Sequence, residues 1–228
     1  ARIVAFKDPL LAKKRTDLAF KSKSGGIWRD RRSQSWVSPY SREVWEYLVA
    51  LGKEAIALGF AEVQYDYVRF PSDGKLAQLV YPEGKPNSKK IGEFLHYATI
   101  AIQSQDPLAI VSADTFGLAG TAIDDLGIGQ KIEELDGTCD YLSPMAYPSH
   151  YAPQTYGLAN PNANPYLTIK RSMEDHQKRV AKSHLRPWLQ AFTLGSPPYG
   201  PTQLASQLKA LQELGILEFL LWNPSSRY

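Results

Sequence analysis

The sequence predicts an α/β fold of the (β/α)8 TIM-barrel type, and two observations lead to this class. Six strand-like segments alternate with helical segments, and no Asn-Gly type hairpin signal joins any two strands, so the strands are expected to pair in parallel. The loops that follow the strands are long and rich in aromatic and polar residues, whereas those that precede them, such as 58–60 and 214–216, are tight. A barrel with its site at the carboxyl ends of the strands shows this asymmetry. An open doubly wound sheet is the alternative, but no Gly-rich phosphate fingerprint follows the first strand.

Each element has its own sequence signal. Strands are predicted at 2–7, 62–68, 108–113, 141–148, 187–192 and 218–224. Helices are predicted at 42–58, 89–105, 166–182 and 202–214, with a helical turn within 10–20. In the first long helix Ser41 can cap the start, apolar residues recur at helical spacing, and Gly59 can close the end. His176, in the third long helix, is expected at the surface.

Composition narrows the function classes. The chain has 228 residues with 43% hydrophobic and 11% aromatic residues, which predicts one domain over 1–228 with a substantial core. The net charge of +3 without a dense basic block does not favour nucleic-acid binding. The lone Cys139 excludes an internal disulfide and a cysteine-rich zinc site, and the four histidines are too scattered for a metal cluster. No metal or cofactor is therefore expected.

The chain begins inside a strand at Ala1, without a signal peptide, and has no apolar run long enough to span a membrane. A closed barrel of this class has eight strands, whereas six are predicted here. Either two β/α units, together with a targeting signal, precede residue 1 in the parent protein, or the chain forms an open or unusual barrel. We expect the first.

Two aspartates mark the candidate active site, because each ends a buried apolar strand. Asp66 lies in the stretch 59–74, where alternation places Val63, Tyr65 and Tyr67 on one face of the strand and Gln64 and Asp66 on the other. Asp114 ends the following strand in the same way. A buried carboxylate is costly unless the site uses it, which favours a functional role. The structural alternative for Asp66 is a strand-end cap or a salt bridge to Arg69.

The loops contain further candidate binding residues, and each of them has a structural and a functional interpretation. Trp28 and Trp36 lie in the long connection 21–40, where they either anchor the loop or form a stacking platform for a sugar or planar ligand. The basic run 29–32 is read as solvated, with a nucleic-acid patch as the minority interpretation. Asp8, at the end of the first strand, either contacts sugar hydroxyls or caps the chain before Pro9.

Five ordered motifs resemble a bacterial family of glycosyl-hydrolase-like TIM-barrel domains, domain of unknown function 4015. They cover nearly the whole chain: ARIVAFKDPLLA at 1–12, GGIWRD at 25–30, YDYVRFPSDG at 65–74, SPMAYPSHY at 143–151 and LWNPS at 221–225. The resemblance implies a TIM-barrel domain lacking two N-terminal β/α units, and an extracellular or cell-envelope location. It does not supply a substrate, so the activity rests partly on analogy.

The expected activity is hydrolysis of an O-glycosidic bond in a polysaccharide. Neighbouring strands lie about 4.8 Å apart, so inward acids on adjacent strand ends have the spacing of a glycosidase carboxylate pair. Asp66 is expected to be the nucleophile or base, kept ionised by Tyr67 or Arg69, and Asp114 the general acid, desolvated by Phe116. Residues at the later strand ends are expected to bind substrate, although large aromatics there can also be core residues: Tyr147, His150, Gln190, Trp222 and Asn223.

The alternative is a catalytically inactive carbohydrate-binding or cell-envelope scaffold barrel. It stays open because no glutamate lies at a strand end, since Glu62 and Glu218 are at strand starts.

Overall fold

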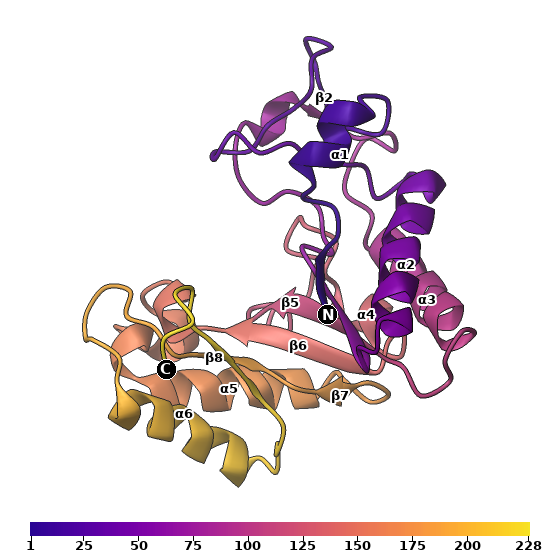
Figure 1. The fold of residues 1–228 in the computed structure, drawn as a ribbon. Coiled ribbons are helices and arrows are strands. Elements are labelled where there is room, and N and C mark those ends of the chain that lie inside the picture. Colours follow the sequence, from indigo (N-terminus) through magenta and orange to yellow (C-terminus); the bar gives the residue numbers. More distant parts are fainter. The chain divides into compact units, whose positions relative to one another are not determined.

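The structure is a computed structural model that describes all residues, 1–228, and the chain divides into two compact units. The first unit comprises residues 1–114 and 124–140, and the second comprises 115–123 and 141–228 (Figure 1). Each unit contains parallel strands with helices between them, and each is described by itself. No helix of either unit has the length and apolar character needed to cross a bilayer.

The first unit is built on three parallel strands, β1 (Arg2–Val4), β3 (Glu62–Asp66) and β5 (Ile110–Phe116). The last two residues of β5 belong to the second unit. They pair in the order β1-β3-β5. Arg2 lies opposite Gln64, which in turn lies opposite Ser112. Because of this register, paired residues of the three strands point to the same face of the sheet, and one face carries polar side chains.

The opposite face is apolar and is covered by helices. Helix α2 (Arg42–Ala57) begins at Ser41, whose Oγ accepts from the Val44 N–H, and it lies beside α3 (Ser88–Gln103) (Figure 1). The fully buried Phe94 ring is the centre of the packing, 5.1 Å from the Phe6 ring and 5.2 Å from the Tyr65 ring. Two short helices complete this unit, α1 (Pro9–Lys14) and α4 (Ile132–Leu135).

Two long loops of the first unit join in a small antiparallel sheet that the sequence did not predict. Strand β2 (Lys21–Ser22) pairs with β4 (Leu79–Val80), which follows the 3-10 turn η1 (Leu76–Gln78). The two strands are too short, and too far apart in the chain, to produce an alternation or hairpin signal. They connect the loop after β1 to the loop after β3.

The second unit contains the parallel strands β6 (Tyr141–Ala146), β8 (Trp188–Gln190) and β9 (Leu220–Trp222), and the short β7 (His184–Leu185) pairs with β6. Helices α5 (Pro165–Gln177) and α6 (Pro201–Glu213) pack against each other (Figure 1). Three 3-10 turns lie between β6 and α5, at Pro148–His150 (η2), Thr155–Gly157 (η3) and Pro161–Ala163 (η4). The core of this unit is aliphatic and includes Ala146, Ile169, Met173, Leu189 and Leu211.

Two local expectations are wrong. His176 is fully buried in α5 rather than exposed, with its Nδ1 2.8 Å from the Ser172 carbonyl oxygen. Tyr67 does not continue the face of Tyr65, because its φ of 51° ends the strand alternation at Asp66. A positive φ is uncommon for a tyrosine, and sequence alternation carries no signal for it.

Candidate active site

The polar face of the first unit's strands carries an ionic cluster made of one arginine and two aspartates. Asp66 and Asp114 each come two residues after the paired Gln64 and Ser112, so alternation returns both side chains to the same face as Arg2. The Asp66 side chain is 4% exposed and that of Asp114 is 2% exposed. Both carboxylates are therefore withdrawn from bulk water.

Arg2 contacts both of these carboxylates. Its Nη2 forms an ion pair with Asp66 Oδ2, and its Nε lies 3.7 Å from Asp114 Oδ2. The other oxygen of Asp66 accepts the Tyr67 N–H at 2.6 Å. Because one guanidinium group reaches both acids, the two carboxylates lie within the roughly 9.5 Å limit for glycosidase pairs. The sequence pattern does not point to Arg2, because only the strand register places a residue at the start of β1 beside Asp66 and Asp114.

A second cluster lies beside Tyr67. The Lys7 ammonium is 5.0 Å from the centroid of the Tyr67 ring, and the Arg69 guanidinium is 5.1 Å from it. The same two cations lie 5.8 and 5.1 Å from the Trp36 ring, which meets the Tyr67 ring edge to face at 5.8 Å. Cation–π contacts of this kind are strengthened by desolvation. This aromatic–cation cluster directly follows Asp66 in the chain.

Asp30 holds the second cluster together. Its Oδ2 accepts from Lys7 Nζ at 3.0 Å and from Trp36 Nε1 at 3.2 Å, while its Oδ1 accepts the backbone N–H groups of Arg32 and Gln34. Burial alone would raise the pKa of Asp30, but these hydrogen bonds outweigh burial and hold the pKa below its ordinary value. Asp30 was not among the residues expected at the site.

The remaining candidates of the first unit are firmly anchored. Arg69 is 7% exposed, donates to the Phe70 carbonyl at 2.9 Å, and has its pKa lowered by burial. Trp28 is 3% exposed and its Nε1 donates to the Lys75 carbonyl at 3.1 Å. Trp36 is likewise buried. Asp8 caps α1, since its Oδ1 accepts from the Leu10 and Leu11 N–H groups.

The other five candidates belong to the second unit. Tyr147 and His150 stack edge to face at 5.3 Å, and burial lowers the pKa of His150. Gln190 is fully buried and its Oε1 accepts the Ser149 N–H at 3.0 Å. Trp222 meets the Trp188 ring at 5.8 Å, and Asn223 Nδ2 donates to the Ala191 carbonyl at 2.6 Å. Seven of the twelve candidates therefore belong to the first unit and five to the second, and the contacts described above join only some members of each set.

Comparison with family models gives a match over residues 1–228 to DUF4015, described as "Putative glycosyl hydrolase domain". The match spans the complete described chain, including both units. Comparison with curated proteins gives no match.

Solved structures with the same fold include sugar-cleaving enzymes. An α-galactosidase from Thermus thermophilus in complex with stachyose is similar over 98% of this chain and 45% of that chain, with 15% identity and a TM-score of 0.59. The glycoside hydrolase domain of PelA from Pseudomonas aeruginosa is similar over 100% of this chain and 79% of that chain, with 10% identity and a TM-score of 0.56. These likenesses confirm the predicted TIM-barrel type of fold, and the six predicted strands correspond to β1, β3, β5, β6, β8 and β9.

A hypothetical protein from Ruminiclostridium thermocellum ATCC 27405 is more similar in sequence, at 38% identity over 55% of this chain and 57% of that chain, with a TM-score of 0.43. The chain therefore spans about half the length of the first solved structures that it matches.

Proposed function

Since this chain belongs to the "Putative glycosyl hydrolase domain" family, we propose that it hydrolyses an O-glycosidic bond with Asp66 and Asp114 as the carboxylate pair. The observation that carries the assignment is the shared contact of both acids with Arg2, because it joins two buried carboxylates from neighbouring strands in one cluster. A carboxylate pair is the machinery that most glycoside hydrolases use.

The two acids have different roles in this proposal. Asp114 donates a proton to the glycosidic oxygen, so that the bond to the anomeric carbon breaks with a neutral leaving group. If the configuration is retained, Asp66 attacks the anomeric carbon, and water deprotonated by the Asp114 carboxylate then breaks the sugar–Asp66 bond. If the configuration is inverted, Asp66 removes a proton from the water that attacks the anomeric carbon. The contact that the Tyr67 N–H makes with Asp66 fixes the orientation of one carboxylate and supports Asp66 as the ionised partner.

The proposed substrate is a polysaccharide of the bacterial cell wall or of a biofilm, and the proposed location is the cell envelope or the extracellular space. The half-buried Tyr67 ring and Lys7 ammonium support a saccharide substrate, because a ring and a hydrogen-bonding cation beside a carboxylate suit a sugar with apolar and polar faces. Cell fractionation of the source organism tests the location, and recovery of the protein in the cytoplasm alone would contradict it.

The activity is tested by incubating the complete parent protein with stachyose and with a panel of cell-wall and biofilm polysaccharides, and identifying the products by mass spectrometry. On a substrate that is cleaved, Asp66→Asn and Asp114→Asn should each reduce kcat by at least about a hundredfold. The matched control is Asp106→Asn in the turn after α3, which should keep full activity. Full activity in both site variants would exclude this carboxylate pair.

One observation favours a second candidate, carbohydrate binding without hydrolysis. Arg2 compensates both buried acids, and a general acid must carry a proton when the substrate binds. Retention of a polysaccharide by the wild-type protein without new reducing ends would select this candidate.

A further inference from the structure

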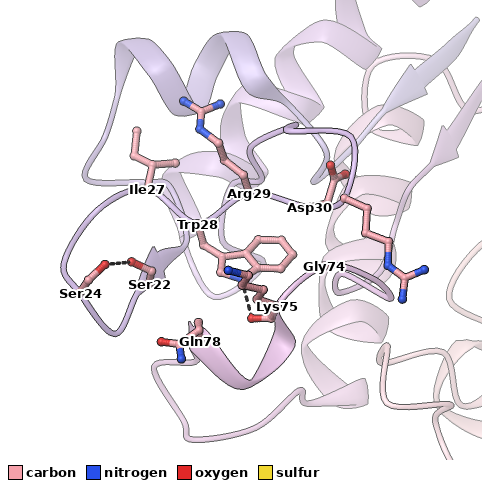
Figure 2. Close-up of a pocket in the computed structure, with 10 residues that line it drawn as sticks. Ser22, Ser24, Ile27, Trp28, Arg29, Asp30, Gly74, Lys75 and Gln78 are labelled. Carbon is pink, nitrogen blue, oxygen red and sulfur yellow. Dashed lines mark hydrogen bonds between the residues drawn. The ribbon is translucent and has the colours of Figure 1, made fainter.

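The first unit contains a groove that does not include Asp66 or Asp114, the two residues of the proposed chemical step. It lies between residues 22–31, which begin at the end of β2, and residues 74–78, which precede β4 (Figure 2). Its volume is about 600 Å³. We call it the Trp28 groove, because the Trp28 indole lies at its centre with Arg29 on one side and Lys75 and Gln78 on the other. Its volume is in the usual range for ligand sites.

The two loops that form the Trp28 groove are held together by direct contacts. The Trp28 Nε1 donates to the Lys75 carbonyl at 3.1 Å, and the Lys23 N–H donates to the Gln78 carbonyl at 2.8 Å. Gly74 has a φ of 89°, and a Cβ placed there would lie 3.0 Å from the Trp28 ring and from the Asp30 Cα. The backbone at Gly74 therefore packs closely on the facing loop, and the groove is formed before a ligand arrives.

The charge of the groove is positive. Arg29, Arg31 and Lys75 line it and are exposed. Two acids lie nearby, but both accept hydrogen bonds from the loops themselves: Asp73 Oδ1 from the Arg31 N–H at 3.1 Å, and Asp30 from the partners described above. Ser22 and Ser24, joined at 2.7 Å between their hydroxyls, add neutral hydrogen-bonding groups at one end (Figure 2).

We propose that the Trp28 groove is a binding site for an acidic polysaccharide whose sugars carry carboxylates, that is, a uronic-acid chain. Arginine pairs with a carboxylate through two parallel hydrogen bonds, and the serine hydroxyls and the Gln78 amide match the hydroxyls of sugar rings. A single-stranded nucleic acid fits less well, because Trp28 is 3% exposed and offers no open ring face for a base. The groove binds the polysaccharide, and the Asp66–Asp114 pair is not part of the groove.

The experiment measures binding rather than cleavage. Polygalacturonate, its carboxyl-reduced neutral form, dextran sulfate and single-stranded DNA are titrated by calorimetry against Asp66→Asn protein, in which loss of hydrolysis does not affect the readout. We expect polygalacturonate to bind, to weaken as salt rises, and to bind at least about tenfold more tightly than each of the other three polymers. Tighter or equal binding of the reduced polymer, the sulfated polymer or DNA would overturn the proposal.

The site is tested with the double variant Arg31→Gln/Lys75→Gln, whose side chains are exposed and should not affect folding. The matched control is Lys13→Gln/Lys14→Gln at the end of α1, which removes the same charge from an exposed surface elsewhere in the unit. The groove variant should weaken polygalacturonate binding at least about tenfold, and the control should leave it within about twofold. If both double variants lost polygalacturonate binding equally, the polymer would be attracted by the net charge of the protein alone, and the proposal would be overturned.

Discussion

Arg2 Nε lies 3.7 Å from Asp114 Oδ2, while the Nη2 of the same guanidinium pairs with Asp66. The arginine side chain is 39% exposed, whereas the two carboxylates are almost completely buried. One solvent-accessible guanidinium group therefore contacts two buried carboxyl groups across three strands. The geometry makes Arg2 the residue on which the electrostatic balance of the candidate site depends.

Arg2→Gln should lower the free energy of unfolding by about 1 to 3 kcal/mol, because it leaves two buried carboxylates without their shared cation. This loss is smaller than the loss expected on breaking a fully buried ion pair, because the Arg2 side chain is accessible to water, which weakens its electrostatic contacts. Urea unfolding at neutral pH measures the change.

The matched control for this prediction is Arg32→Gln, an exposed arginine that should change stability by less than about 0.5 kcal/mol. Adding Asp66→Asn to Arg2→Gln should recover part of the loss, since the double variant buries one uncompensated charge fewer. Additive losses in the double variant would mean that Arg2 and Asp66 are not energetically coupled.

Asp30→Asn should destabilise the first unit in a pH-dependent way. The folded-state pKa of Asp30 is held below its ordinary value, so its contribution to stability is fully present above about pH 4 and is lost as pH falls through the folded pKa. We expect a cost of about 2 kcal/mol at pH 7, since Lys7 and two backbone amides lose an ionised acceptor.

Urea unfolding from pH 7 down to pH 3 checks this linkage. The stability curves of wild type and Asp30→Asn should converge as the pH falls below about 4. Glu46→Gln on the exposed side of α2 serves as the control and should run parallel to wild type. If the difference in unfolding free energy between wild type and Asp30→Asn stayed constant from pH 7 to pH 3, the pH dependence would not come from Asp30.

The alternation of apolar segments was sufficient to predict the order of the six main strands and the four long helices, because each buried strand and each amphipathic helix carries its own local period. Asp66 and Asp114 could be singled out because each is a carboxylate that follows apolar residues in the sequence. The structure places Asp66 at the end of β3, whereas Asp114 lies within β5, two residues before its end. Arg2 could not, because its contacts arise from the pairing of residues more than sixty positions apart.

The loops were less predictable than the strands. The β2–β4 sheet and the Trp28 groove depend on contacts between residues 21–31 and 74–80, and neither segment has a period that marks it as a strand. Trp28 and Trp36 could be recognised as ordered, but only the structure shows that Trp28 lines a groove while Trp36 packs with Tyr67.

Gly92 in α3 should not tolerate a side chain. Ala normally stabilises a helix relative to Gly, but a Cβ at Gly92 would lie 2.3 Å from the backbone carbonyl oxygen of Glu134, which follows the start of α4. Backbone cannot move aside as a side chain can, so Gly92→Ala should cost about 1 to 3 kcal/mol and lower Tm.

Gly52 in α2 is the matched comparison for Gly92. A Cβ there would meet the end of the Ile102 side chain at 2.9 Å and the Tyr65 hydroxyl at 3.0 Å, and both groups can shift. Gly52→Ala should therefore be less destabilising than Gly92→Ala in thermal unfolding. A Gly92→Ala protein as stable as wild type would show that α4 does not approach α3 as described.

His176 should make the stability of the second unit sensitive to mild acid. Its ring is fully buried, and burial lowers the pKa to about 4. Nδ1 faces the Ser172 carbonyl oxygen and so carries the ring proton, while Nε2 has no hydrogen-bond partner. A second proton on Nε2 would be buried without an acceptor, which is the physical reason that the neutral form is favoured.

The sign of the effect follows from the two states. The unfolded histidine takes up a proton near pH 6.5 and the folded one only near pH 4, so the free energy of unfolding falls by up to about 3 kcal/mol between these values. His176→Gln should flatten this part of the pH–stability curve, whatever its cost at pH 7. His96→Gln, on the exposed side of α3, should keep the wild-type slope. A slope that survives His176→Gln would assign the acid sensitivity to another group.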